Sequence, residues 1–137
     1  MSSLLVTRAD VTLTTKAAEG PVRWEAPEAW EVPKRYNKKS DVWSYGVALY
    51  EMFVRKHPYE HLESNTQVGL QVSKGYRLEV PDQNALGQPI PPLIKSIMQR
   101  CWESEGARRP SMAQIVTALT TNTPLPAVDE VLAMLCD

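Results

Sequence analysis

The sequence is short of several residue types, and each shortage excludes a class of protein. Only two of its 137 residues are cysteine, Cys101 and Cys136, too few for the disulfide framework of a small secreted domain. Lys and Arg number 15 against 16 Asp and Glu, a balance that gives no electrostatic reason to expect nucleic acid or an anionic membrane as a partner. No apolar run comes near the roughly 20 residues of a membrane span, and Met1–Val6 lacks the basic start of a signal peptide. We therefore expect a cytoplasmic protein that contacts neither nucleic acid nor membrane.

Proline, by contrast, is frequent, and it separates short segments with helical patterns. The 11 prolines are scattered without a period, which is typical of breaks between short elements. Apolar spacing and capping residues predict helices at 26–30, 41–54, 65–74, 93–102, 110–119 and 128–135. Ser40 is the expected N-cap of the second helix, with Asp41 in its first turn, and Gly75 is the expected C′ residue of the third. No alternating strand pattern appears, so the predicted fold class is mainly α.

Apolar side chains recur at helical spacing in the later segments. Those predicted to face inward are Leu93, Ile94, Ile97, Met98 and Cys101 in one helix, and Met112, Ile115, Val116 and Leu119 in the next. Such stripes are the packing face of an amphipathic helix.

The helix at 41–54 has a different pattern. Between Val42 and Val54 only Ser44 and Glu51 are distinctly polar, so this helix is apolar all round and must be enclosed on every side. The other predicted helices are short and amphipathic, and we expect them to give too little cover. The large side chains that they cannot all shield are Val42, Tyr45, Leu49, Met52 and Phe53. The sequence thus predicts that a face of this helix stays exposed.

Five short motifs follow one another in an order that is typical of one enzyme family. Residues 21–28, Pro-Val-Arg-Trp-Glu-Ala-Pro-Glu, resemble the end of a protein-kinase activation segment. Residues 40–47, Ser-Asp-Val-Trp-Ser-Tyr-Gly-Val, are similar to the start of the central buried helix of the kinase C-lobe. Three later motifs resemble the turn after that helix, the stretch after the next helix and the closing pair of helices: His57-Pro58-Tyr59, Gly75-Tyr76-Arg77-Leu78 before Pro81, and Cys101-Trp102 before Arg109-Pro110. The predicted fold is therefore a partial protein-kinase C-lobe.

The resemblance implies a division of the chain and a subgroup. Residues 1–19 would be an activation-segment remnant or flexible lead-in, 20–121 a partial kinase-like C-lobe, and 122–137 a tail with a short amphipathic helix. Neither Ser nor Thr occurs from Lys16 to Tyr36, where Ser/Thr kinases usually carry a threonine, so the match is to tyrosine kinases or tyrosine-kinase-like relatives. The implied platform for an aromatic acceptor ring is Pro21, Val22, Arg23 and Trp24. Glu25 departs from the Met or Thr that relatives often have there.

Four further residues have structural roles implied by the resemblance. Glu28 and Arg109 resemble the family's ion pair between the activation segment and the closing helices; the alternative is two solvated charges that contribute about 0–1 kcal/mol. In the family Asp41 accepts backbone N–H bonds from the catalytic loop. That loop is not in this sequence, so stabilisation by the helix dipole is the favoured interpretation. Trp43 is most simply part of the core.

The groups that handle nucleotide in the family are missing from this sequence. The six glycines, at positions 20, 46, 69, 75, 87 and 106, are too far apart for a glycine-rich phosphate lid. The only phenylalanine, Phe53, lies between Met52 and Val54, which excludes an Asp-Phe-Gly motif. Neither histidine begins a His-Arg-Asp loop, because His57 precedes proline and His61 precedes leucine. We therefore assign no catalytic, cofactor-binding or metal-ligating residue, and expect ATP and Mg only if an upstream half is present.

Two functions from different classes follow. In the first, the chain is the C-terminal fragment of a tyrosine-kinase-like domain, inactive and unable to bind ATP alone, whose partners are a protein substrate and the missing kinase half. In the second, it is a non-catalytic kinase remnant that binds a protein partner through the exposed face of helix 41–54. A third interpretation, an unrelated helical adaptor, requires the motif order to be chance.

Overall fold

The computed structural model describes residues 22–30 and 37–135. Its elements are the 3₁₀ helices η2 (Val22–Trp24), η3 (Pro27–Trp30) and η4 (Gly106–Arg108), and the helices α2 (Lys38–Val54), α3 (Asn65–Ser73), α4 (Pro92–Cys101), α5 (Met112–Thr121) and α6 (Val128–Leu135). Within these residues there is no strand, only an isolated antiparallel bridge between Gln83 and Pro89. The predicted mainly α class is confirmed.

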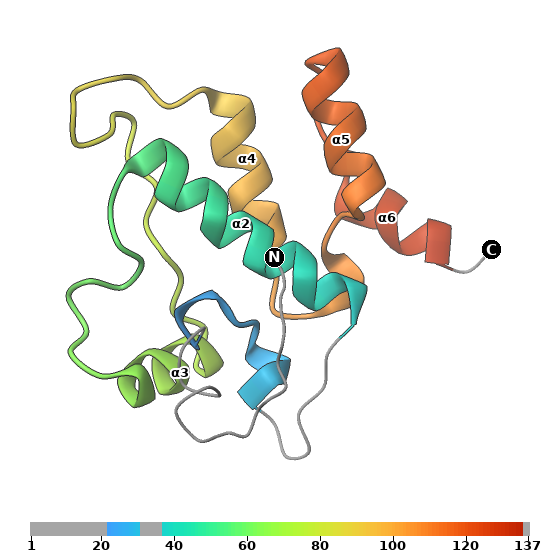
Figure 1. Cartoon of the computed structure of the whole chain (residues 1–137). Coiled ribbons are helices and arrows are strands. Elements are labelled where there is room, and N and C mark those ends of the chain that lie inside the picture. Colours follow the sequence, from blue (N-terminus) through green and yellow to red (C-terminus); the bar gives the residue numbers. More distant parts are fainter. Residues whose placement is uncertain (1–21, 31–36, 136–137) are drawn as a thin grey trace, which may run out of the picture.

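Helix α2 is the centre of the molecule. In Figure 1 it runs alongside α4, with η2, η3 and α3 grouped on one side and α5 and α6 on another. Trp43 and Val47 are fully buried in it. A Cβ atom on Gly46 would lie 2.6 Å from Cβ of Cys101, so glycine is what allows α4 to pack this closely against α2. The elements that carry the predicted site are thus arranged around one buried helix.

The start of α2 differs from the prediction. The N-cap is Asn37, whose side chain accepts hydrogen bonds from the backbone N–H groups of Lys39 and Ser40. Ser40 is the third residue of the helix, and its hydroxyl oxygen accepts a hydrogen bond from the backbone N–H of Asn37, which completes a capping box. The predicted cap, Ser40, lies three residues late because serine suits both positions of such a box. Asp41 does lie in the first turn, where it is exposed.

The cover over α2 is more complete than the sequence predicted. Val42 and Leu49 are buried, and Tyr45 and Phe53 are partly buried against the core. Only Met52, with 60% of its surface exposed, is left uncovered among the five large side chains in question. The short helices therefore enclose most of α2, and the expected exposed face reduces to the side that carries Met52.

The predicted inward face of α5 was wrong in three of its four residues. Ile115 is buried, but Met112, Val116 and Leu119 are 39%, 53% and 37% exposed. The helix packs instead through Ile115 and Ala118. In a ten-residue helix with adjacent apolar stripes, the spacing of apolar residues does not indicate which stripe packs against the core. The helix also begins two residues later than expected, at Met112, after an N-cap at Ser111.

The remaining helices agree with the sequence. Helix α3 ends at Ser73, and Gly75 follows with a φ of +107°, a left-handed conformation that favours glycine. In α4 the buried residues are Ile94, Ile97, Met98 and Cys101. Among the described helices none is long and apolar enough to cross a bilayer. Residues 1–19, the proposed lead-in, lie outside the described part of the chain, and the domain division stays a prediction.

Candidate functional site

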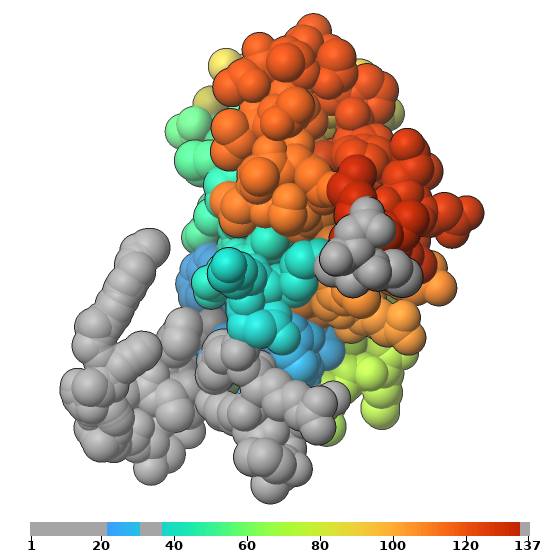
Figure 2. Space-filling view, turned by 90° about the vertical axis from the view of Figure 1, so that its right-hand side faces the viewer, coloured from blue at the N-terminus to red at the C-terminus, as the bar shows by residue number. Residues whose placement is uncertain are grey.

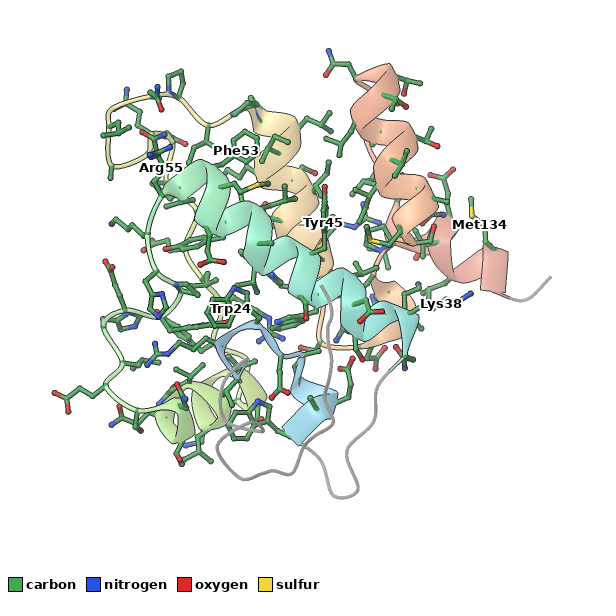
Figure 3. The ribbon with its side chains drawn as sticks, in the orientation of Figure 1. Trp24, Lys38, Tyr45, Phe53, Arg55 and Met134 are labelled. Carbon is green, nitrogen blue, oxygen red and sulfur yellow. The ribbon has the colours of Figure 1, made fainter. Side chains whose placement is uncertain are left out.

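Trp24, the last residue of η2, is held by helix α2. Its indole Nε1–H donates to Oε1 of Glu51 at 2.7 Å, and its carbonyl accepts a 2.7 Å bond from the Ser44 hydroxyl. The ring meets that of His57 edge-on, with 5.9 Å between centroids. Ser44 and Glu51 are the two polar residues in an otherwise apolar helix, so the sequence pattern marked them as unusual. That Trp24 is their partner could not be read from the sequence. Figure 3 shows Trp24 between α2 and the α3 side of the molecule.

Arg23, the neighbouring residue, is held by a different part of the chain. Nε donates to Oδ1 of Asn65 at 3.0 Å, and Nη2 donates to the carbonyl of Leu62 at 3.0 Å. Nη1 donates to the carbonyls of Pro58 and Tyr59 at 3.1 and 2.7 Å. The guanidinium is thus directed into the loop between α2 and α3. This direction was not predictable from the sequence, because three of the acceptors are backbone oxygens that lie 35 or more residues away.

The predicted acceptor platform is only partly described. Pro21 lies outside the described residues, and Val22 is buried. Arg23 and Trp24 are half-buried and tied to separate elements. The structure therefore shows how residues 22–24 are fixed, and their contact with an acceptor stays a prediction.

The predicted ion pair between Glu28 and Arg109 forms, across 81 residues of sequence. Nη1 of Arg109 lies 2.7 Å from Oε2 of Glu28, and Nη2 lies 2.9 Å from Oε1. This bidentate geometry is the strongest form of an arginine–carboxylate pair. The Arg109 side chain has no exposed surface and that of Glu28 only 15%. The pair joins η3 to the segment before α5.

Arg109 uses its other donors on backbone oxygens. Nε donates to the carbonyl of Glu103, Nη1 also to that of Lys39, and Nη2 also to that of Ser104. In return, Nζ of Lys39 donates to the carbonyl of Arg109 at 2.6 Å. All five N–H groups of the guanidinium therefore have acceptors, which offsets the cost of burying its charge.

Electrostatics at this pair follow from burial and hydrogen bonding. Burial raises the pKa of the Glu28 carboxyl, but hydrogen bonds from Arg109 and Ser40 outweigh it, and the net pKa lies below the ordinary value of 4.5. Burial and the neighbouring Arg109 charge both lower the pKa of Lys39. Trp43, predicted to be structural, is fully buried, with the guanidinium carbon of Arg109 5.1 Å from its ring centroid. The site is thus a rigid structural junction.

Comparison with known proteins agrees with this geometry. Residues 1–119 match the family described as protein tyrosine and serine/threonine kinase. The chain belongs to this kinase family. It is 44% identical over 100 residues to the megakaryocyte-associated tyrosine-protein kinase of Mus musculus, covering 72% of this chain and 18% of that protein. It is 43% identical over 96 residues to the tyrosine-protein kinase transforming protein Fps of avian sarcoma virus (strain PRCII), and the match covers 69% of this chain and 16% of that protein.

A third relative extends the match along the chain. The tyrosine-protein kinase TXK of Mus musculus is 37% identical over 112 residues, covering 81% of this chain and 20% of that kinase. The chain therefore spans a fifth or less of the length of these relatives. The resemblance to the C-lobe portion of a tyrosine-kinase-like domain, first inferred from five motifs, is confirmed.

Proposed function

We propose that this chain is the acceptor-side part of a tyrosine-kinase-like domain, and that it does not bind ATP by itself. In the complete domain it would present a protein hydroxyl, that of tyrosine, for phosphoryl transfer. The observation that carries the proposal is the bidentate Glu28–Arg109 pair, because it fixes the segment after the platform to the closing helices. Trp24 and Arg23 then hold the platform to α2 and to the α2–α3 loop.

The absence of the family's nucleotide-binding motifs from the sequence supports the part of the proposal that concerns ATP. Phosphoryl transfer needs a lid, a lysine that holds the phosphates, metal ligands and a base-positioning Asp. The part of the chain that the structure describes has no group of three His, Cys, Asp or Glu side chains able to hold a metal ion. The sequence has no glycine-rich loop. ATP and Mg would accordingly enter only together with a nucleotide-binding half.

A chimera tests the acceptor-side role. The matching 100 residues of the murine megakaryocyte-associated kinase are replaced by those of this chain, and phosphorylation of tyrosine and serine peptides is compared. We expect transfer to tyrosine peptides and none to serine peptides. The control is the same chimera with Trp24→Ala, which removes the contact to Glu51 and should lower transfer. A folded chimera that transfers no phosphate, or transfers equally to serine, would contradict the proposal.

The second candidate is the non-catalytic module that binds a protein partner at α2. One observation favours it: Met52 is 60% exposed in a helix that is otherwise largely enclosed, and exposed apolar side chains in patches often mark interaction surfaces. A Met52→Gln variant would then lose the partner without losing stability. The chimera separates the two functions, since a pure binding module would not complete a kinase domain.

A further inference from the structure

Arg23 differs from an ordinary surface arginine in the groups that accept hydrogen bonds from its guanidinium. Among the residues that the structure describes, its acceptors are three backbone carbonyls and one amide oxygen, and none is a carboxylate. These contacts therefore do not neutralise the charge, but they fix the guanidinium plane in one orientation, because Nε, Nη1 and Nη2 all donate to separate acceptors. These hydrogen bonds to neutral oxygens therefore fix the position of the Arg23 side chain, and they supply no ion-pair attraction.

The loop that receives Arg23 has a backbone conformation that needs support. Tyr59 has a φ of +54°, a left-handed conformation that is unfavourable for a bulky residue. Its carbonyl accepts the shortest of the four bonds from Arg23, at 2.7 Å. Arg23 therefore helps to hold this loop, and the loop in turn holds Arg23.

The two neighbouring platform residues are anchored independently. Trp24 is bonded to Glu51 and Ser44 of α2, while Arg23 is bonded to the loop that leads into α3. Helix α3 also packs against η3, where the Trp30 ring lies over Gly69. The backbone between Arg23 and Trp24 is consequently set by the relative position of α2 and the α2–α3 loop.

We propose that Arg23 is a positioning residue that couples the acceptor platform to the α2–α3 loop, so that acceptor affinity depends on the loop at residues 58–62. This rests on the proposed function, in which the platform receives the acceptor. The guanidinium of Arg23 is directed into the α2–α3 loop, so Arg23 acts on the acceptor through Trp24 and the platform backbone. Small displacements of a positioning group have large effects on binding geometry.

Arg77 provides a matched control elsewhere in the fold. It is also a half-buried arginine whose guanidinium donates to several chain oxygens, and its guanidinium carbon lies 4.7 Å from the Trp43 ring centroid. Its acceptors are the carbonyls of Trp102, Val72 and Tyr76 and the hydroxyl of Ser104. Loss of Arg77 removes a comparable set of bonds without touching the platform.

The full chain labelled with 5-fluorotryptophan gives the decisive test. Its four tryptophans give four ¹⁹F signals, assigned by Trp→Phe variants. We expect Arg23→Gln to shift the signal of Trp24 and leave those of Trp43 and Trp102 in place, and Arg77→Gln to do the reverse. An unchanged Trp24 signal in Arg23→Gln, or equal shifts of all four, would overturn the positioning role.

Acceptor affinity is measured on the same chains with a labelled glutamate–tyrosine copolymer as the probe. Arg23→Gln should weaken binding on the order of tenfold, as expected for loss of several charge-assisted bonds. Arg77→Gln should change affinity less than about twofold, since none of the hydrogen-bond acceptors of Arg77 belongs to the platform or to residues 58–62. Arg23→Lys should recover part of the affinity, because the lysine ammonium keeps the charge and can still donate to the loop carbonyls. Equal losses of affinity in Arg23→Gln and Arg77→Gln would overturn the coupling.

Absence of copolymer binding by the unmodified chain would contradict the proposed function, and the fluorine spectra would still decide whether Arg23 positions Trp24.

Discussion

At the scale of single residues, Arg109 shows how a charge is kept inside a small helical domain. The guanidinium is fully buried, bonded to both oxygens of Glu28 and to three backbone carbonyls. Breaking a buried pair by removing one partner strands the other charge, at a cost of about 3–5 kcal/mol. We therefore expect Glu28→Ala and Arg109→Ala each to lose about this much unfolding free energy, measured by urea denaturation.

The chain also contains a control for that experiment. Arg108 and Glu105 form an exposed pair at 3.2 Å, with side chains 46% and 74% exposed, for which we expect less than about 1 kcal/mol. In a double-mutant cycle the Glu28–Arg109 losses should be far from additive, and the Arg108–Glu105 losses nearly additive. Additive losses at Glu28 and Arg109 would mean that the two residues are not coupled.

The lowered pKa of Glu28 predicts how stability depends on pH. A carboxyl whose folded pKa is depressed stabilises the protein above its unfolded pKa, here 4.5, and this contribution is lost as pH falls through the lower folded value. Urea midpoints of the unmodified chain and of Glu28→Gln are compared from neutral pH to pH values below 4.5. The difference between the two urea midpoints should be largest at neutral pH and should disappear in acid. A gap that stays constant would show that the ionised form is not what stabilises the fold.

At the scale of elements, the contact of α3 with η3 depends on the absence of one side chain. A Cβ atom on Gly69 would lie 2.3 Å from atoms of the Trp30 ring, closer than any real contact allows. We expect Gly69→Ala to destabilise the chain by about 1–3 kcal/mol through overpacking, seen as a lower urea midpoint. Adding Trp30→Leu to this variant should recover part of the loss. If the double variant is no more stable than Gly69→Ala, the clash is not with Trp30.

The sequence predicted elements best where one pattern allowed one interpretation. Helix α4 has a single apolar stripe, and its predicted buried residues Ile94 and Ile97 are buried. Helix α5 has two adjacent stripes, and its predicted inward face was wrong because burial depends on neighbours that are distant in sequence. The start of α2 was misplaced because both Asn37 and Ser40 belong to its capping box.

The candidate site divides in the same way. The Glu28–Arg109 pair was predictable because two family motifs contain its partners, although no local pattern links residues 81 positions apart. The direction of Arg23 was not predictable, since its acceptors are carbonyls arranged by a left-handed residue, Tyr59, in a distant loop. Side-chain identity alone does not encode such backbone acceptors.

At the scale of the whole molecule, the core is closed at its centre but leaves apolar side chains on several elements. In the described part of the chain, the large hydrophobic residues that are more than half exposed are Met52, Leu70, Leu86, Val116 and Met134. Figure 2 shows the α5 side of the molecule, with α5 above the N-terminal part of α2 and α6 beside them. Helix α5 presents Met112, Val116 and Leu119 at positions i, i+4 and i+7, one continuous stripe of a helix.

This stripe decides the behaviour that we expect of the isolated chain. Uncovered side chains forfeit about 1.5–3 kcal/mol each when fully exposed, against a typical total stability of only 5–15 kcal/mol, and they favour association. We expect the chain to bind the dye ANS and to self-associate in sedimentation velocity.

A Met112→Gln/Val116→Gln variant should bind less dye and associate less without losing stability, because both side chains are already exposed. The matched control Ile115→Val alters the buried side of the same helix: it should lower stability by about 0.5–1.5 kcal/mol and leave association unchanged. A monodisperse chain that unfolds sharply and binds no dye would show that these helices close the core unaided, and would favour an independent partner-binding module over part of a larger kinase domain.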